Sequence, residues 1–313
     1  MKIAVLFPGQ GSQFLGMGRE FAEQDPRSAE ILTLAESVCG VPLRRICEQG
    51  PMEELTRAAV LQPAITATNL MCLSALRQAL PATAAISCYA GHSLGEYSAL
   101  CAAGVLGVEQ TIRLVERRGF FMEREGLKNP GGMRAVLGLP INRVEDAVAA
   151  AQANGVVTVA NYNTAEQIVI SGSEAGLVAA SEALDQQGGK VIELNVGVAN
   201  HSPLVAGSVA DFSAVMAKVE FHPPRAPVYF NVTAATESEP AMIKEMMARQ
   251  IASRVRWYES ITRMLEDGVD TFIEVGPKNV LKGMLRKIVP KSAAVSAHQF
   301  DTPAGLEKVL ATL

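Results

Sequence analysis

The sequence has few cysteines, and none of them forms a recognisable metal-binding or redox motif. The five cysteines include no C-x-x-C pair and no Cys/His cluster at metal-ligand spacing. They lie among apolar neighbours, which predicts reduced, buried thiols and no metal site. Cys88 and Cys101 flank the serine motif described below, and we interpret both as small core residues.

Long basic runs and long apolar runs are also missing. A net charge of −4 without a basic run argues against nucleic acid as a partner. No uninterrupted apolar run reaches the roughly 18 residues that span a bilayer, which argues against a membrane protein. The N-terminal segment MKIAVLFPGQGSQ has a short apolar core and leads directly into a glycine-rich turn. It is therefore interpreted as the first buried strand of a cytoplasmic protein and not as a secretory signal.

The stretch AAISCYAGHSLGEYSALCAAG, residues 84–104, carries the clearest chemical signal. An apolar run is followed by the G-x-S-x-G pattern of a nucleophile elbow and then by a helix rich in Ala and Leu. Gly91 and Gly95 would allow a sharp strand-to-helix turn with Ser93 at its apex. The following helix would direct unpaired N–H groups at the site. Ser93 is the candidate nucleophile, with a neighbouring backbone N–H for the oxyanion.

The rest of the chain alternates strands and helices, which predicts a mainly parallel sheet covered on both faces. The 313 residues, 49% of them hydrophobic, are enough for a full core and a smaller second unit. Residues 131–196 follow a β-α-β-β-α-β order, that of a ferredoxin-like unit. We therefore expect residues 1–130 and 197–313 to form the large α/β subdomain and 131–196 an inserted small one.

Four arginines lie on the expected helix 108–126, and one of them differs from the rest. At about 100° per residue, Arg118 falls beside the apolar stripe and Arg117 opposite it. Arg118 can therefore flank a buried surface, whereas the other three arginines fit a solvated helix face.

A nucleophilic serine needs a base, and chain order favours His201. It follows the serine and lies in a loop between a strand and a helix, as in α/β-hydrolase-type folds. His222, in a proline-rich turn, is the alternative. The group that orients the histidine is left open, with Asp211, Asp267 and Glu274 as candidates by position.

Six motifs in order give the chain a family resemblance: FPGQGSQ, GHSLGEYSAL, RLVERRG, the His201-Ser-Pro-Leu stretch, Arg249-Gln250 and EVGP. Together they resemble the malonyl-CoA:acyl carrier protein transacylases, which include the fatty-acid synthesis enzyme and the acyltransferase domains of polyketide synthases. The resemblance covers essentially the whole length. It implies an α/β-hydrolase-like large subdomain with a ferredoxin-like insert, no bound cofactor, and malonyl-CoA and a phosphopantetheinylated acyl carrier protein as substrates.

The resemblance also implies roles for individual residues. Ser93 corresponds to the nucleophile and His201 to the general base, while the main chain of Gln250 would orient the histidine. Arg118 corresponds to the group that binds the malonyl carboxylate. The oxyanion hole would consist of the backbone N–H groups of two further residues, Gln10 and Leu94. The candidates for the pocket wall are His92, Asn161, Asn163 and Asn200.

The sequence departs from the family pattern in two places. Val198-Ala199-Asn200 stands where an aromatic residue or serine usually precedes the histidine, which leaves the preference between malonyl and substituted malonyl groups open. The stretch from Asn163 to Gln167 lacks the usual Pro-Gly, so that loop is expected to differ.

Three other functions compete with the one that the resemblance implies. A serine esterase or thioesterase would share the elbow and base, and a carrier-binding subunit would lack catalysis. A stand-alone acyltransferase serving a polyketide synthase would use the same chemistry. An acidic carrier protein would need a basic surface. A candidate is the cluster on the expected helix 279–289, whose alternative is an ordinary solvated face; it comprises Lys278, Lys282, Arg286 and Lys287.

Overall fold

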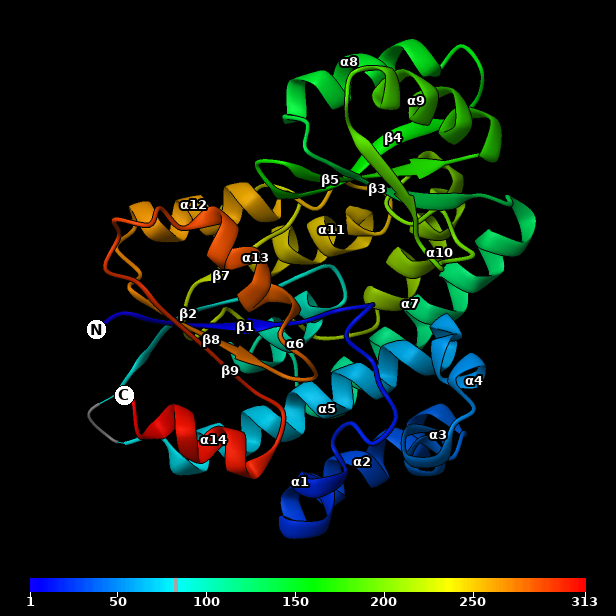
Figure 1. Ribbon diagram of the computed structural model, residues 1–313. Helices are drawn as coiled ribbons and strands as arrows, with labels where there is room; N and C mark the ends of the chain where they lie inside the picture. The colour runs from blue at the N-terminus through cyan, green and yellow to red at the C-terminus, as the bar shows by residue number, and fades with distance from the viewer. Residues whose placement is uncertain (82–83) are drawn as a thin grey trace.

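A computed structural model describes residues 1–81 and 84–313 as two β-sheets with helices packed on them (Figure 1). Sheet A has five strands, all parallel, that place the chain's first strand at the centre. Their order is β7 (Val228–Tyr229), β2 (Ile86–Gly91), β1 (Ile3–Phe7), β8 (Thr271–Val275) and β9 (Ser296–Phe300). Every residue of β1 is buried, as expected for a parallel strand covered on both faces.

Alternate side chains of β1 enter two different cores. Ile3, Val5 and Phe7 belong to the larger core, which includes the long helix α5 (Ala58–Ala79). Ala4 and Leu6 face α12 (Trp257–Glu266) and α13 (Val280–Ile288) on the other side. In Figure 1, α5 passes below sheet A, and α12 and α13 lie above it. The mainly parallel sheet with two covered faces is confirmed.

The remaining helices of this part of the chain surround the two cores. They are α1 (Arg19–Gln24), α2 (Pro26–Cys39), α3 (Leu43–Gln49), α4 (Met52–Thr56), α6 (Gly95–Ala102), α7 (Val108–Lys128), the 3-10 turn η1 (Pro203–Val205), α10 (Gly207–Met216), α11 (Pro240–Gln250) and α14 (Pro303–Leu310).

Sheet B is antiparallel and forms the lobe at the top of Figure 1. Its strands are arranged in the order β4 (Val157–Thr164), β5 (Gln167–Gly172), β3 (Gly132–Leu137) and β6 (Lys190–Glu193). Two helices, α8 (Ile141–Ala151) and α9 (Glu174–Gln186), cover one face with a separate apolar core. This is the expected ferredoxin-like order.

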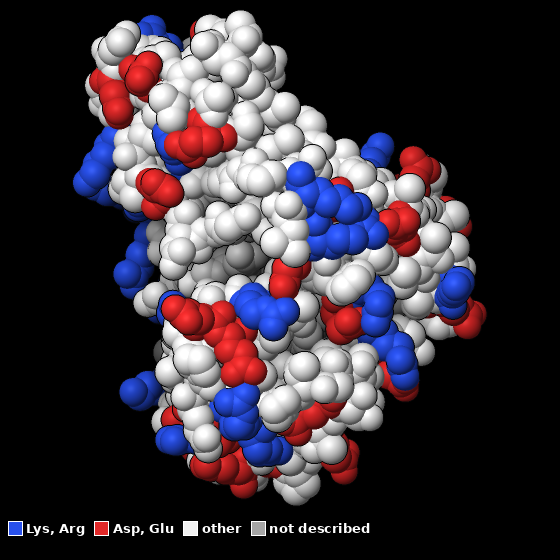
Figure 2. Space-filling model, turned by 90° about the vertical axis from the view of Figure 1, so that its right-hand side faces the viewer, with Lys and Arg blue, Asp and Glu red and all other residues white. Residues whose placement is uncertain are grey.

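The lobe is joined to the rest of the chain by contacts as well as by covalent connections. Arg254 Nη1 lies 2.7 Å from a carboxylate oxygen of Glu145, and Asn161 forms a parallel bridge with Val255. All of sheet B lies between residues 131 and 196, and the division of the chain into two subdomains at these residues stays a prediction. The face shown in Figure 2 is hollowed between this lobe and the large body, and side chains of both charge signs gather along the rim.

Some expected elements have different bounds. The run Gln62-Pro63-Ala64 predicts the start of a long apolar helix, because proline is common in the first turn. The helix α5 instead begins at Ala58 and contains Pro63. The loss of one N–H at this proline is tolerated because the helix is buried on most sides. The Ser/Ala/Gln-rich composition around His298 predicts a tail, whereas residues 296–300 form the edge strand β9 beside β8. The residue pattern predicts a helix over 243–253, whereas α11 ends at Gln250, the residue whose carbonyl lies beside His201.

Among the residues that the structure describes, one helix has the length and mean hydropathy of a membrane span. This helix is α5, with 83% of its most apolar window buried inside the protein. It is a core helix of sheet A, packed between α2 and α7.

Candidate active site

Ser93 lies at the apex of the predicted elbow, between β2 and α6. Its backbone is in the left-handed region with φ of 50°, a strained conformation for a residue with a side chain. A Cβ on Gly91 would collide with the backbone of Gly95, and one on Gly95 would collide with the carbonyl of Phe7. The two glycines therefore allow β1, β2 and α6 to approach closely enough to hold the serine at the turn.

The side-chain amide of Asn231 holds the elbow through two hydrogen bonds to its backbone. Its Oδ1 accepts a hydrogen bond from Ser93 N at 2.7 Å, and its Nδ2 donates to the carbonyl of Gly91 at 2.8 Å. Asn231 is fully buried. The Asn231 amide thus connects the last residue of β2 with Ser93, and its two hydrogen bonds restrict the backbone of the turn.

His201 is the histidine that reaches Ser93. The distance from Ser93 Oγ to His201 Nε2 is 2.7 Å. On the other side of the ring, Nδ1 lies 3.1 Å from the carbonyl oxygen of Gln250 and 2.9 Å from that of Ser253. Because carbonyl oxygens only accept, Nδ1 carries the hydrogen and Nε2 is the acceptor for the serine hydroxyl.

Burial keeps this imidazole neutral. Loss of solvation, followed by the nearby charge of Arg118, lowers the pKa of His201 to about 3. A neutral Nε2 is the form that can take a proton from serine. Its orientation comes from two backbone carbonyls that become available because α11 ends at Gln250.

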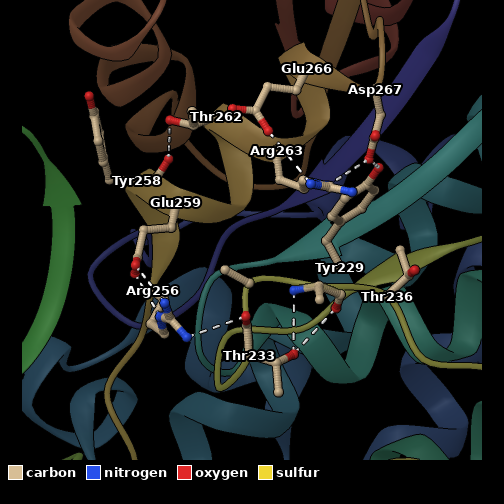
Figure 3. Close-up of a pocket in the computed structure, with 12 residues that line it drawn as sticks. Tyr229, Thr233, Thr236, Arg256, Tyr258, Glu259, Thr262, Arg263, Glu266 and Asp267 are labelled. Atoms are coloured by element: carbon tan, nitrogen blue, oxygen red, sulfur yellow. Dashed lines mark hydrogen bonds and ion pairs between the residues drawn. The ribbon is translucent and has the colours of Figure 1, made fainter.

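None of the three carboxylates considered for orienting His201 lies beside it. Asp211 pairs with Arg124 at 2.7 Å, and Glu274 accepts hydrogen bonds from the backbone N–H groups at the start of α13. Asp267 accepts from the hydroxyl of Tyr229 at 2.7 Å (Figure 3). His222 is also excluded as the base, because its exposed ring is directed toward Glu220.

Asp267 instead borders a separate polar cavity of about 470 Å³. Figure 3 shows its lining arginines paired with carboxylates. Arg256 lies 2.6 Å from Glu259, and Arg263 lies 3.4 Å from Asp267. With its arginines already paired with carboxylates, this cavity offers little for an anionic ligand.

Arg118 is buried beside the nucleophile. Only 1% of it is exposed, and its Nη2 lies 3.2 Å from Ser93 Oγ. The other partners of the guanidinium are neutral amide oxygens, Gln250 Oε1 at 3.0 Å and Gln62 Oε1 at 2.9 Å. Its Nε has no hydrogen-bond partner among the residues described. Burial lowers the pKa of Arg118, but a guanidinium stays charged at neutral pH.

The arrangement of Arg118 suits an anion at the elbow. No carboxylate forms an ion pair with it within residues 1–81 and 84–313. A buried cation with only neutral partners is poorly compensated, and a carboxylate beside Ser93 would supply the missing charge. Arg117 is half-exposed, as the helical pattern predicts.

The loop after β1 lies against the elbow, where the oxyanion hole was expected. His92 N donates to the carbonyl of Phe7 at 3.0 Å, and a Cβ on Gly9 would lie 3.4 Å from Leu94 N. Gln10 N and Leu94 N donate to no acceptor in the described part of the chain. Both N–H groups are thus available to a ligand next to Ser93.

The four candidates for the pocket wall are all near the junction with sheet B. His92 Nε2 lies 2.8 Å from Asn163 Oδ1, and its ring packs edge-on against Trp257. Asn161 is buried on β4. Asn200 is buried next to His201, and its Oδ1 has no partner among the residues described. The stretch lacking Pro-Gly forms a tight turn between β4 and β5.

Four residues that contact the site were missed by sequence reasoning: Gln62, Glu96, Asn231 and, through its carbonyl, Ser253. The buried Glu96 had a signal, because it is a charged residue at the start of an otherwise apolar helix. Gln62 and Asn231 had none, since each acts through a contact distant in sequence. No group of three or more His, Cys, Asp or Glu side chains that could hold a metal occurs among the described residues.

Comparison with known proteins places this geometry in a family. The family model described as "Acyl transferase domain" matches residues 5–300. The chain belongs to the acyl transferase family. This acyl transferase is 37% identical over 305 residues to a malonyl CoA-acyl carrier protein transacylase of Bacillus subtilis, covering 96% of this chain and 95% of the relative.

A second relative and a solved structure agree. The acyl transferase is 34% identical over 310 residues to the malonyl CoA-acyl carrier protein transacylase of Haemophilus influenzae, covering 99% of each chain. It is also similar to a chain in the complex of a type II polyketide synthase acyl-carrier protein with its malonyl-transacylase. There the TM-score is 0.95 at 33% identity, and 100% of each chain is covered. These likenesses confirm the fold class and the family resemblance.

Proposed function

We propose that this acyl transferase moves a malonyl group from malonyl-CoA to the phosphopantetheine thiol of an acyl carrier protein. The observation that carries the proposal is the position of Arg118. Its buried guanidinium lies 3.2 Å from the same Ser93 hydroxyl that is bonded to His201. A nucleophile with a cation beside it fits an acyl group that ends in a carboxylate.

In the first half-reaction, Ser93 Oγ attacks the thioester carbon of malonyl-CoA. His201 Nε2 takes the hydroxyl proton, and the carbonyls of Gln250 and Ser253 hold the protonated ring through Nδ1. The N–H groups of Gln10 and Leu94 would bind the oxyanion. The carbon–sulfur bond then breaks, the CoA sulfur takes the proton from His201, and a malonyl-serine ester is left.

The second half-reaction reverses these roles. The phosphopantetheine thiol of the carrier protein gives its proton to His201 and attacks the ester carbon. The ester carbon–oxygen bond breaks, and Ser93 recovers its proton from His201. Malonyl-carrier protein leaves, so the overall mechanism is ping-pong.

Arg118 supplies selectivity for a diacid. A carboxylate would form charge-assisted hydrogen bonds with it, whereas an acetyl group would leave the guanidinium with neutral partners only. Hydrogen bonds to charged groups contribute roughly 1.5–3 kcal/mol each, so a preference of about tenfold or more for malonyl is expected.

The printed names of the relatives support both the donor and the acceptor. They name malonyl CoA and acyl carrier protein, and the polyketide complex contains a carrier protein bound to its transacylase. The same reaction would serve fatty-acid or polyketide synthesis. We propose that no resident cofactor takes part and that the protein works in the cytoplasm. The latter is supported by its five free cysteines.

A serine thioesterase or esterase would use the same serine and histidine, and product analysis separates the two. With malonyl-CoA and a phosphopantetheinylated carrier protein, we expect malonyl-carrier protein to form as CoA is released. Ser93→Ala should abolish this transfer. Ser98→Ala, which removes a buried hydroxyl one turn further along α6, should retain it. Free malonate as the main product would contradict the proposal and indicate a hydrolase.

A further inference from the structure

Glu96 is a buried carboxylate whose position the reaction above leaves unexplained. It lies in the first turn of α6, three residues after Ser93, and has no exposed surface. Removing a carboxylate from water is costly unless its oxygens have good partners. Here desolvation raises the pKa of Glu96 to about 7 despite two hydrogen bonds that favour the charged form. A group retained at such a cost next to a reacting serine is a candidate for a functional role.

Both oxygens of Glu96 accept from groups that also contact the site. Its Oε1 accepts from the backbone N–H of Asn231 at 2.7 Å, and its Oε2 accepts from Gln250 Nε2 at 2.5 Å. Asn231 is the residue whose side chain fixes the elbow. Gln250 is the residue whose carbonyl orients His201. The carboxylate thus connects the two supports of the catalytic pair.

The side-chain amide of Gln250 has a single orientation that satisfies its neighbours. Its Oε1 accepts from Arg118 at 3.0 Å, while its Nε2 donates to the Ser93 carbonyl at 2.8 Å and to Glu96. A flipped amide would direct N–H groups at the guanidinium, which is a donor, and its oxygen at two further oxygens. Because the Ser93 carbonyl and Glu96 accept from Gln250 Nε2, the amide oxygen of Gln250 faces Arg118.

We propose that Glu96 is a positioning residue that fixes the side-chain amide of Gln250 and, through it, the guanidinium of Arg118. This inference rests on the proposed malonyl transfer and goes one step further. Arg118 has no carboxylate partner of its own in the described chain, so the two amide oxygens and Ser93 Oγ define its place. Glu96 touches none of the reacting atoms, and its hydrogen bond to Gln250 Nε2 is the contact through which it positions the amide that faces Arg118.

The test compares malonyl and acetyl transfer in two variants, Glu96→Gln and Glu96→Ala. The amide can accept from only one of the two donors, and alanine from neither. Acetyl-CoA has no carboxylate for Arg118 to bind. We therefore expect kcat/KM for malonyl-CoA to fall relative to acetyl-CoA by about threefold in Glu96→Gln and about tenfold in Glu96→Ala, mainly through a higher KM for malonyl-CoA.

Glu274→Gln is the matched control. Glu274 is also fully buried and accepts from two backbone N–H groups, those of Leu281 at 3.0 Å and Lys282 at 2.8 Å, but it lies outside the site. Its substitution should lower the melting temperature and leave the malonyl-to-acetyl ratio at the wild-type value. This separates a loss of stability from a change in positioning.

An unchanged or raised malonyl-to-acetyl ratio in both folded Glu96 variants would overturn the inference, as would equal loss with both substrates. Glu96→Gln keeps the shape of the side chain, so the test stands even where Glu96→Ala does not fold. A wild-type protein without malonyl transfer would instead contradict the proposed function, which keeps the two failures distinct.

Discussion

At the scale of single residues, Arg118 determines which acyl groups the site should prefer. Removing it takes away the only cation that touches Ser93 in the described structure. We expect Arg118→Ala to lower kcat/KM for malonyl-CoA about tenfold or more relative to acetyl-CoA, because only the malonyl group loses a charge-assisted contact. Steady-state transfer rates with both thioesters measure this.

The adjacent arginine provides the control for that measurement. Arg117 is half-exposed and pairs with Glu116 on the far side of the same helix. Arg117→Ala should leave the ratio of malonyl to acetyl transfer unchanged. If Arg118→Ala lowered kcat/KM for malonyl-CoA and acetyl-CoA by the same factor, Arg118 would support the fold of the site and not recognise the carboxylate.

His201 should make the native protein sensitive to acid. Its native pKa is lowered to about 3, whereas an unfolded histidine titrates near 6.5. As the pH falls below about 6.5, His201 binds a proton in the unfolded state but stays neutral in the native state. The free energy of unfolding therefore decreases. Between about pH 7 and about pH 4.5 the wild type should lose on the order of 2 kcal/mol more than His201→Gln.

Denaturant unfolding of both proteins at the two pH values gives this difference. An equal loss of stability in the two proteins would show that the native imidazole titrates normally. It would also remove the argument that His201 is held neutral for proton transfer.

The sequence predicted these residues to different extents. Ser93 and His201 follow from a local motif and from chain order, and both lie where expected. The helical pattern was enough to distinguish Arg118 from its three neighbours on α7. Asn231 and Gln62 could not be found in this way, because each reaches the site from a segment with no local signal. Position in the chain suggested only carboxylates as the orienting group of His201, whereas the family resemblance implied the main chain of Gln250. The structure places the carbonyls of Gln250 and Ser253 at His201 Nδ1.

At the scale of elements, the elbow depends on the close approach of three backbones. A methyl group on Gly95 would collide with the carbonyl oxygen of Phe7 on β1. We therefore expect Gly95→Ala to destabilise the protein by about 1–3 kcal/mol or more and to displace Ser93, with transfer activity lost. Chemical denaturation and the transfer assay measure the two effects.

Gly283→Ala tests whether the effect belongs to the elbow. Gly283 lies inside α13, and a Cβ there would meet nothing within 4 Å. Because alanine favours a helix over glycine, this substitution should stabilise by about 0.5–1 kcal/mol without changing the formation of the malonyl-serine ester from malonyl-CoA. If Gly95→Ala were tolerated equally well, the close approach would not be needed to hold the serine.

The bounds of elements were less predictable than their existence. Pro63 marked a helix start in the sequence, but tertiary burial allows α5 to begin earlier and include it. The polar residues of β9 do not predict a strand, and its parallel pairing with β8 stabilises it. α11 ends at Gln250, and in the turn that follows the carbonyls of Gln250 and Ser253 face His201 Nδ1. The resemblance implied the role of Gln250, whereas Ser253 had no signal in the sequence.

At the scale of the whole molecule, a carrier protein must reach the elbow from outside. The carboxyl ends of β1 and β2 point to the right of Figure 1, the side that Figure 2 turns to the viewer. Lys278 contacts the loop that follows β1, with its Nζ 3.3 Å from the carbonyl of Gly11. Lys278, at the start of the basic cluster, therefore lies beside the loop that follows β1, and we keep the cluster as the proposed docking surface.

Charge reversal on α13 tests this surface. Arg286 and Lys287 are exposed, so Arg286→Glu with Lys287→Glu should leave the fold intact. We expect the KM for an acidic carrier protein to rise about threefold or more at low salt, and the KM for malonyl-CoA to stay unchanged. Lys308→Glu, on the exposed side of α14, is the control. Equal effects of the two changes would exclude α13 as the docking surface.

The central claim is that Ser93 carries the malonyl group between donor and acceptor, and intact-protein mass spectrometry tests it most directly. After mixing with malonyl-CoA, the wild type should gain the mass of one malonyl group, and Ser93→Ala should gain none. Adding a phosphopantetheinylated carrier protein should remove the adduct and transfer its mass to the carrier. A malonyl adduct on Ser93→Ala, or a wild-type adduct that the carrier thiol fails to accept, would contradict the account.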